Sequence, residues 1–226
     1  PVMKAKSNSD RIVITGLGMI SSLGHNVVTS CAAARAGITR LSELYGLQLT
    51  DPDTEAIEQA MGHSVSGFTD GFSGLGRLVR LGLAGLKDLI TYSGLSEWRN
   101  TGLFINLSSG FYLKEWEKAE RSKLEESEVD QEILPYDMEL RDQVYQTWLI
   151  PSLLKLAKIS IEPANQRIFF GDQTGFAQAL QKAIENLQSG QIERCIIGGI
   201  DSYVEEDSLE ATYYFDLLKT PSRGVG

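Results

Sequence analysis

The stretch Arg167-Ile-Phe-Phe-Gly-Asp-Gln-Thr-Gly175 decides how the rest of the chain is interpreted. A short apolar run ends at Gly171, and a helical pattern follows it. A sharp turn between a strand and a helix is where several enzyme classes hold a nucleophile. The amide of Gln173 in this turn can form hydrogen bonds, but it cannot form an acyl intermediate. The sequence therefore predicts the scaffold of an acyl-transfer site without its reactive atom.

The segments around this turn alternate between apolar runs and amphipathic patterns, which predicts an α/β fold with a mostly parallel sheet covered by helices. The expected strands are 11–20, 101–107, 167–170 and 194–200. The expected helices are 25–36, 77–91, 114–132, 140–159 (cut by Pro151), 175–188 and 208–218. Residues 40–75 are predicted to be an irregular insertion with one short helix at 54–61. We expect one domain from residue 11 to 226 and a disordered or tag-derived segment at 1–10.

The amino-acid composition disfavours several classes of function. The 226 residues include 30 acidic and 21 basic side chains, a net charge of −9. This balance disfavours nucleic-acid binding, which depends on contacts to phosphates. No run of about 18 apolar residues is present and the N-terminal segment has no apolar stretch of a signal peptide, so we expect no membrane span. Two cysteines without metal spacing predict a reducing cytoplasm.

Most other motifs have an ordinary structural interpretation. Gly16, Gly18 and Gly24 do not have dinucleotide-loop spacing. The two histidines and two cysteines do not form a zinc pattern, so we expect no metal and no cofactor. Cys31 and Cys195 are expected to fill the core as small apolar side chains.

Polar residues at the ends of the expected strands are candidates for a pocket, because ligands bind at the carboxyl ends of parallel strands. The candidate lining residues are Ser108, Ser109, Asp172, Gln173, Thr174 and Phe176. Asp201-Ser202 also follows a strand. Placement in a loop is the simpler explanation for the serines, and a turn cap also explains Asp201.

Three segments together resemble the N-terminal half of a β-ketoacyl synthase of the thiolase superfamily. They are Arg11-Ile-Val-Ile-Thr-Gly-Leu-Gly-Met-Ile-Ser-Ser-Leu-Gly24, Arg99-Asn-Thr-Gly-Leu-Phe-Ile-Asn-Leu-Ser-Ser-Gly110, and 177–202 with its Ile196-Ile-Gly-Gly-Ile-Asp-Ser202. The segment 218–223 resembles the segment just before the family's second half. The tail 220–226 neither ends a helix nor completes a strand, so we expect a fragment, a half or a disordered remainder. The resemblance implies a βαβαβαββ half-fold.

The resemblance also places the family's catalytic cysteine. Counting back from Ser189-Gly190 puts that position on Gln173. In the family, the cysteine attacks an acyl thioester from a helix N-terminus, whose dipole favours the thiolate. The family's two catalytic histidines belong to the second half, and His25 and His63 do not match them.

Family dimers pair through the strand before the nucleophile. That strand carries Arg167, Phe169 and Phe170 here, so the resemblance implies a homodimer or a heterodimer with another thiolase-like chain through this edge.

We weigh three hypotheses. The first is a non-catalytic thiolase-like scaffold, a pseudo-β-ketoacyl synthase that serves as an adaptor or chaperone for a protein client in a bacterial secretion or biosynthetic assembly. The alternative is a 3-oxoacyl-acyl-carrier-protein synthase component or a chain-length-factor-like subunit in fatty-acid or polyketide synthesis, acting with a catalytic partner. The third is a module that binds acyl groups without turnover.

Overall fold

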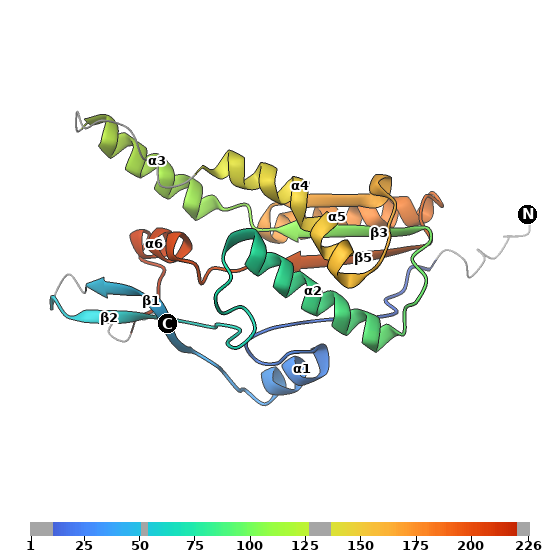
Figure 1. Cartoon of the computed structure of the whole chain (residues 1–226), viewed down its shortest axis with the longest axis horizontal. Coiled ribbons are helices and arrows are strands. Elements are labelled where there is room, and N and C mark those ends of the chain that lie inside the picture. Colours follow the sequence, from blue (N-terminus) through green and yellow to red (C-terminus); the bar gives the residue numbers. More distant parts are fainter. Residues whose placement is uncertain (1–10, 51–53, 127–136, 221–226) are drawn as a thin grey trace, which may run out of the picture.

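The protein is a mixed α/β protein with a parallel sheet, a separate hairpin and several helices (Figure 1). The computed structural model describes residues 11–50, 54–126 and 137–220. The helices are α1 (Val27–Arg35), α2 (Gly74–Ser93), α3 (Phe111–Glu126), α4 (Met138–Ala157), α5 (Asp172–Gln188) and α6 (Glu206–Tyr214). The strands are β1 (Ser42–Thr50), β2 (Ile57–Gly62), β3 (Thr101–Leu107), β4 (Gln166–Phe170) and β5 (Arg194–Ile200).

The three strands predicted at 101–107, 167–170 and 194–200 are confirmed, and they form one parallel sheet. Its order is β4-β3-β5, with Ile105 opposite Ile168 on one side and Gly198 on the other. Every residue of β3 is buried. A parallel strand covered on both faces has this near-continuous apolar sequence.

Alternate residues of β3 face two different helix layers. Leu103, Ile105 and Leu107 join a core cluster with residues of α2 and α4. Phe104 lies in a second cluster with Ala179 and Ala183 of α5. Because successive strand side chains point to opposite faces, this division follows from the period of two. Burying a Leu or Phe side chain contributes about 1.5–3 kcal/mol. β3 buries such side chains on both of its faces, so it contributes to both core clusters.

The first turn of α5 lies very close to β3. A Cβ added at Gly175 would overlap Oδ1 of Asn106. Only glycine permits this approach, which brings the start of α5 to the ends of the strands.

The prediction of a strand at 11–20 is wrong. This segment has no regular secondary structure, and Ile12, Val13 and Ile14 are 48%, 69% and 84% exposed. Its glycines anchor it on α2, since a Cβ at Gly18 would overlap the carbonyl of Gly85. The segment therefore lies along a helix and does not pair with the described strands.

The prediction for 40–75 is also wrong in part, because a β-hairpin replaces the irregular insertion and its short helix. β1 and β2 pair antiparallel, with Ser42 opposite Gly62. Leu44, Leu49 and Ala60 pack on Leu209 of α6, and the hairpin lies beside that helix (Figure 1). Tertiary packing here overrides the local helical preference of 54–61.

The remaining boundaries differ by a few residues from those predicted. α4 is not cut at Pro151 and ends where Lys158 has a φ of 58°. Pro151 has no N–H to donate to the carbonyl four residues before it. Because Pro151 is exposed, water can donate to that carbonyl instead. Residues 127–132 of the charged helix and the N-terminal segment 1–10 lie outside the described residues. In the described part of the chain, none of the helices has the length and apolar character needed to cross a membrane.

Candidate functional site

The candidate site lies at the edge of the sheet where the three parallel strands end. Ser108 follows β3 directly, Asp172 follows β4 after one glycine, and Asp201 follows β5. Carboxyl ends of parallel strands meet at one edge, which is where α/β proteins usually bind ligands. Ser108 and Asp172 were among the candidate pocket residues, whereas Asp201 was noted only as a residue that follows a strand.

Asp172 is the strained residue of the strand-to-helix turn. It opens α5 with a φ of 48°, a left-handed conformation that costs a non-glycine residue about 1–2 kcal/mol. The amide of Asn106 donates to the Asp172 carbonyl at 2.7 Å, and Gly171 N donates to the Leu107 carbonyl at 3.1 Å. These bonds tie the turn to the end of β3 and hold the strained conformation in place.

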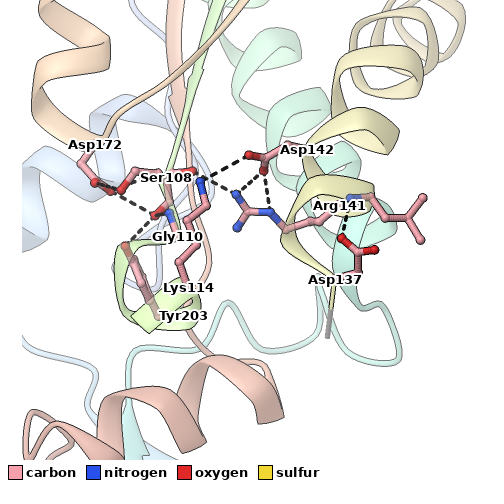
Figure 2. A network of polar contacts seen from close by, with 10 residues as sticks. Ser108, Gly110, Lys114, Asp137, Arg141, Asp142, Asp172 and Tyr203 are labelled. Carbon is pink, nitrogen blue, oxygen red and sulfur yellow. Dashed lines mark hydrogen bonds and ion pairs between the residues drawn. The ribbon is translucent and has the colours of Figure 1, made fainter. Parts of the chain in front are cut away.

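The Asp172 carboxylate accepts hydrogen bonds from two serines of the β3–α3 loop, of which Ser108 is labelled in Figure 2. Ser108 Oγ donates to Oδ1 at 3.0 Å, Ser109 Oγ donates to Oδ2, and Ser109 N lies 3.4 Å from Oδ1. Burial acts to raise the pKa of Asp172, but the hydrogen bonds from Ser109 and Ser108 outweigh it and the net pKa is lowered. The turn therefore carries an ionised carboxylate at neutral pH.

A second layer of polar contacts supports the serine loop. Ser108 Oγ lies 2.8 Å from the hydroxyl of Tyr203. Arg141 of α4 reaches the Ser108 carbonyl at 3.5 Å, with only 9% of its side chain exposed. Asp142 accepts from Arg141 and lies 3.6 Å from Nζ of Lys114 on α3 (Figure 2). The network thus joins α3, α4 and the start of α5.

Asp201 and Tyr203 complete the cluster beside Asp172. Burial raises the pKa of Asp201, and the negative charge of Asp172 raises it further. Burial likewise raises the pKa of Tyr203. Asp201 therefore takes up a proton more readily than an ordinary aspartate, and Asp172 less readily.

A narrow cleft lies beneath these groups. Its lining includes Ser108, Arg141, Asp201 and Tyr203, and its volume is about 40 Å³. One water needs about 10–15 Å³ of such volume, so the cleft holds only a few waters. An acyl chain does not fit in it.

The other candidate pocket residues lie at the surface. Gln173, Thr174 and Phe176 are exposed on the first turn of α5 and do not line the cleft. Within the described part of the chain, the Gln173 amide has no hydrogen bond, whereas Thr174 Oγ1 donates to the Gly171 carbonyl at 2.7 Å. Ser109 and Asp172 sit beside the cleft, and Ser108 lines it.

Neither cysteine lies at this turn. Cys195 is half-buried in β5, and burial raises its pKa to about 12. Cys31 is exposed on α1, so the expectation that it fills the core is wrong. α1 has only nine residues, and most of them are small, so its surface offers the Cys31 thiol little to pack against. This explains why Cys31 is exposed. In the described ranges, no group of three or more His, Cys, Asp or Glu is arranged to hold a metal.

The predicted interface residues lie on β4, which pairs only with β3 among the described strands. Arg167 is exposed. Phe169 packs edge-on against Phe104 at 5.9 Å, and Phe170 packs on the opposite core cluster. The aromatic side chains therefore support the sheet, and the backbone edge of β4 remains open.

Several residues of the network were not predicted from the sequence, among them Asn106, Arg141 and Tyr203. Asn106 left a signal, because it is a polar residue in an otherwise apolar strand. Tyr203 lies two residues beyond the end of β5, next to the candidate Asp201. Arg141 left none, because its position depends on how α4 packs.

Comparison of the chain with protein-family models and with curated proteins gives no match.

Proposed function

We propose that this protein is a non-catalytic, thiolase-like scaffold that works by binding another protein. It is a half-fold of the β-ketoacyl synthase type whose turn no longer holds a nucleophile. The observation that carries the proposal is the Asp172 carboxylate, which occupies the turn and is bonded by Ser108 and Ser109.

The chemistry of the turn supports a role without catalysis. A carboxylate nucleophile needs a free oxygen and space for its substrate. Both oxygens of Asp172 accept a serine hydroxyl, and the cleft beside it holds about 40 Å³. The amide of Gln173, where the resemblance puts the family's cysteine, cannot be acylated by the family's route.

The surface beside the turn supports a protein partner. β4 leaves one edge without a strand among those described, and unpaired edges readily add a strand from another chain. Phe176 and Leu180 lie one helical turn apart on α5, which contacts β4, and are 42% and 44% exposed. A second copy, or another thiolase-like chain, would cover both features. A bacterial secretion or biosynthetic assembly in the cytoplasm is the setting we favour, and the two free cysteines agree with a reducing compartment.

Light scattering during size-exclusion chromatography tests the binding role. We expect the wild-type chain to elute as a dimer and the substitution Leu180→Glu to shift it toward monomer. The matched control is Val28→Glu, which adds the same charge on α1, where Val28 is 63% exposed. A monomeric wild-type chain would count against the dimer through β4.

Mass spectrometry after incubation with acyl-CoA tests the absence of catalysis. We expect no mass increase of an acyl group on any residue. A covalent adduct on either cysteine or on Asp172 would overturn the proposal.

The strained turn supports the alternative of a condensing-enzyme component or chain-length-factor-like subunit. Such turns usually mark functional sites, and Asp172 keeps one here. In this role a catalytic partner supplies the nucleophile and the histidines. An acyl adduct that forms on the partner only when this chain is present would favour the alternative.

A further inference from the structure

A second cavity, unrelated to the Asp172 turn, lies at the base of the hairpin. Three segments line it and leave it open to solvent: the loop before α1, the residues leading into β1, and the residues leaving β2. Ser42 pairs with Gly62 at the open end of the hairpin. This pairing brings the residues leading into β1 beside the residues leaving β2. Its lining residues are Ser21, Ser22, His25, Arg40, Leu41, Ser42, Ser64, Val65 and Ser66.

The lining is rich in hydrogen-bond donors that lack an acceptor. Within the described residues, the Arg40 guanidinium has neither an ion pair nor a hydrogen bond, and the hydroxyls of Ser22 and Ser42 have no partner. Ser64 and Ser66 bond each other at 2.8 Å, which leaves one of their two hydroxyl protons unused. His25 offers a ring N–H in either protonation state.

The charge of this lining is opposite to that of the whole chain. The chain carries a net charge of −9, yet none of the cavity's lining residues is Asp or Glu. An arginine beside several hydroxyls, with no carboxylate to neutralise it, favours an anion at this place. A planar guanidinium such as that of Arg40 can bind two oxygens of one anion at once.

The volume limits the size of the ligand. The cavity holds about 230 Å³, which is below the range of about 300–1,000 Å³ typical of sites for larger ligands. It exceeds the cleft at the Asp172 turn several-fold. A tetrahedral oxyanion with a small substituent fills such a space and presents oxygens to all three segments.

We propose that this cavity binds the phosphate group of a small molecule, with Arg40 as the main ligand and the serine hydroxyls and His25 around it. A carboxylate has two acceptor oxygens in one plane, so it offers fewer directions than a tetrahedral phosphate for bonds to Arg40 and to several hydroxyls together. Phosphate has oxygens for both.

Isothermal titration calorimetry of the full chain with inorganic phosphate tests this, at constant ionic strength and neutral pH. We expect saturable binding that is about tenfold or more weaker in Arg40→Gln, the usual effect of losing a charged hydrogen-bond donor. The matched control is Arg99→Gln, which removes the same charge from an exposed arginine before β3 and should bind as the wild type does. Circular dichroism of both variants checks that they are folded.

Two further titrations identify the ligand's source. Glycerol phosphate that binds more tightly than inorganic phosphate would support a phosphorylated small molecule, and the reverse order would support free phosphate. Acetate that binds as tightly as phosphate would overturn the proposal. Absence of saturable phosphate binding to the wild-type chain, or equal weakening in the Arg40 and Arg99 variants, would overturn it as well.

Discussion

Replacing Asp172 with Asn isolates the negative charge at the strand-to-helix turn. The side chain keeps its shape and one acceptor oxygen, but its second oxygen becomes an NH₂ group facing the hydroxyl of Ser109. A hydrogen bond to a charged group contributes about 1.5–3 kcal/mol, and the favourable position at the start of α5 about 0.3–1 kcal/mol. Because Asp172 is exposed, solvent screens most of this. We expect a loss of about 1 kcal/mol in the free energy of unfolding at pH 7.

The pH dependence gives this prediction its sign. The folded pKa of Asp172 is lowered, so its carboxylate stabilises the fold above the pKa of the unfolded chain, about 4. That contribution is lost as the pH falls through the folded value, where the wild-type group is also protonated. Urea unfolding of D172N and wild type should therefore differ at pH 7 and converge near the acid end of the range.

Two controls keep this result interpretable. Glu97→Gln removes a charge from an exposed loop residue and should change stability by less than about 0.5 kcal/mol. A double-mutant cycle between Asp172→Asn and Ser109→Ala should give a coupling energy of about 0.5 kcal/mol or more. Equal stability of D172N and wild type at pH 7, or a difference that persists unchanged in acid, would refute the reasoning.

Three other substitutions or labels test separate parts of the fold. Gly175→Ala places a Cβ against the side-chain amide of Asn106 and should lower the free energy of unfolding in urea by about 1–3 kcal/mol. The control is Gly199→Ala, whose added Cβ has no atom within 4 Å and should not show such a loss from a clash. Iodoacetamide at pH 8 should label Cys31 first, because burial raises the pKa of Cys195 to about 12; equal labelling in peptide mapping would contradict this. Ile14→Thr should change stability by less than about 0.5 kcal/mol, because Ile14 is 84% exposed; a loss above 1 kcal/mol would show that it is buried.

The sequence predicted best the elements whose apolar pattern has one interpretation. β3 is a continuous apolar run closed by serines and glycine, and its two partner strands end similarly, so all three were expected with the observed bounds to within one residue. Ile12 to Ile14 has the same pattern, yet the packing of Gly16 and Gly18 on α2 keeps it out of the sheet. Such a contact depends on tertiary structure and leaves no local signal.

The site also has features that the local sequence predicts and features that depend on tertiary packing. Ser108, Ser109 and Asp172 were predicted as neighbours because strand ends bring them to one edge. Their specific arrangement was not, because nothing in the sequence marks Asp172 as the residue of the turn with a positive φ. The support from Arg141 depends on α4, whose position relative to the sheet follows from packing of its buried leucines.

The physical character of the turn explains why the proposed role is binding and not turnover. A helix N-terminus that can stabilise a thiolate stabilises a carboxylate equally well, and here the carboxylate has its own donors. A substrate would have to displace the bonds from Ser108 and Ser109 before reaching the turn, and would leave Asp172 charged and without those partners. The network ties the start of α5, the helix that carries the exposed Phe176 and Leu180, to the ends of the strands. If the proposed scaffold role is right, a turn held in this way would present a preorganised surface to the partner.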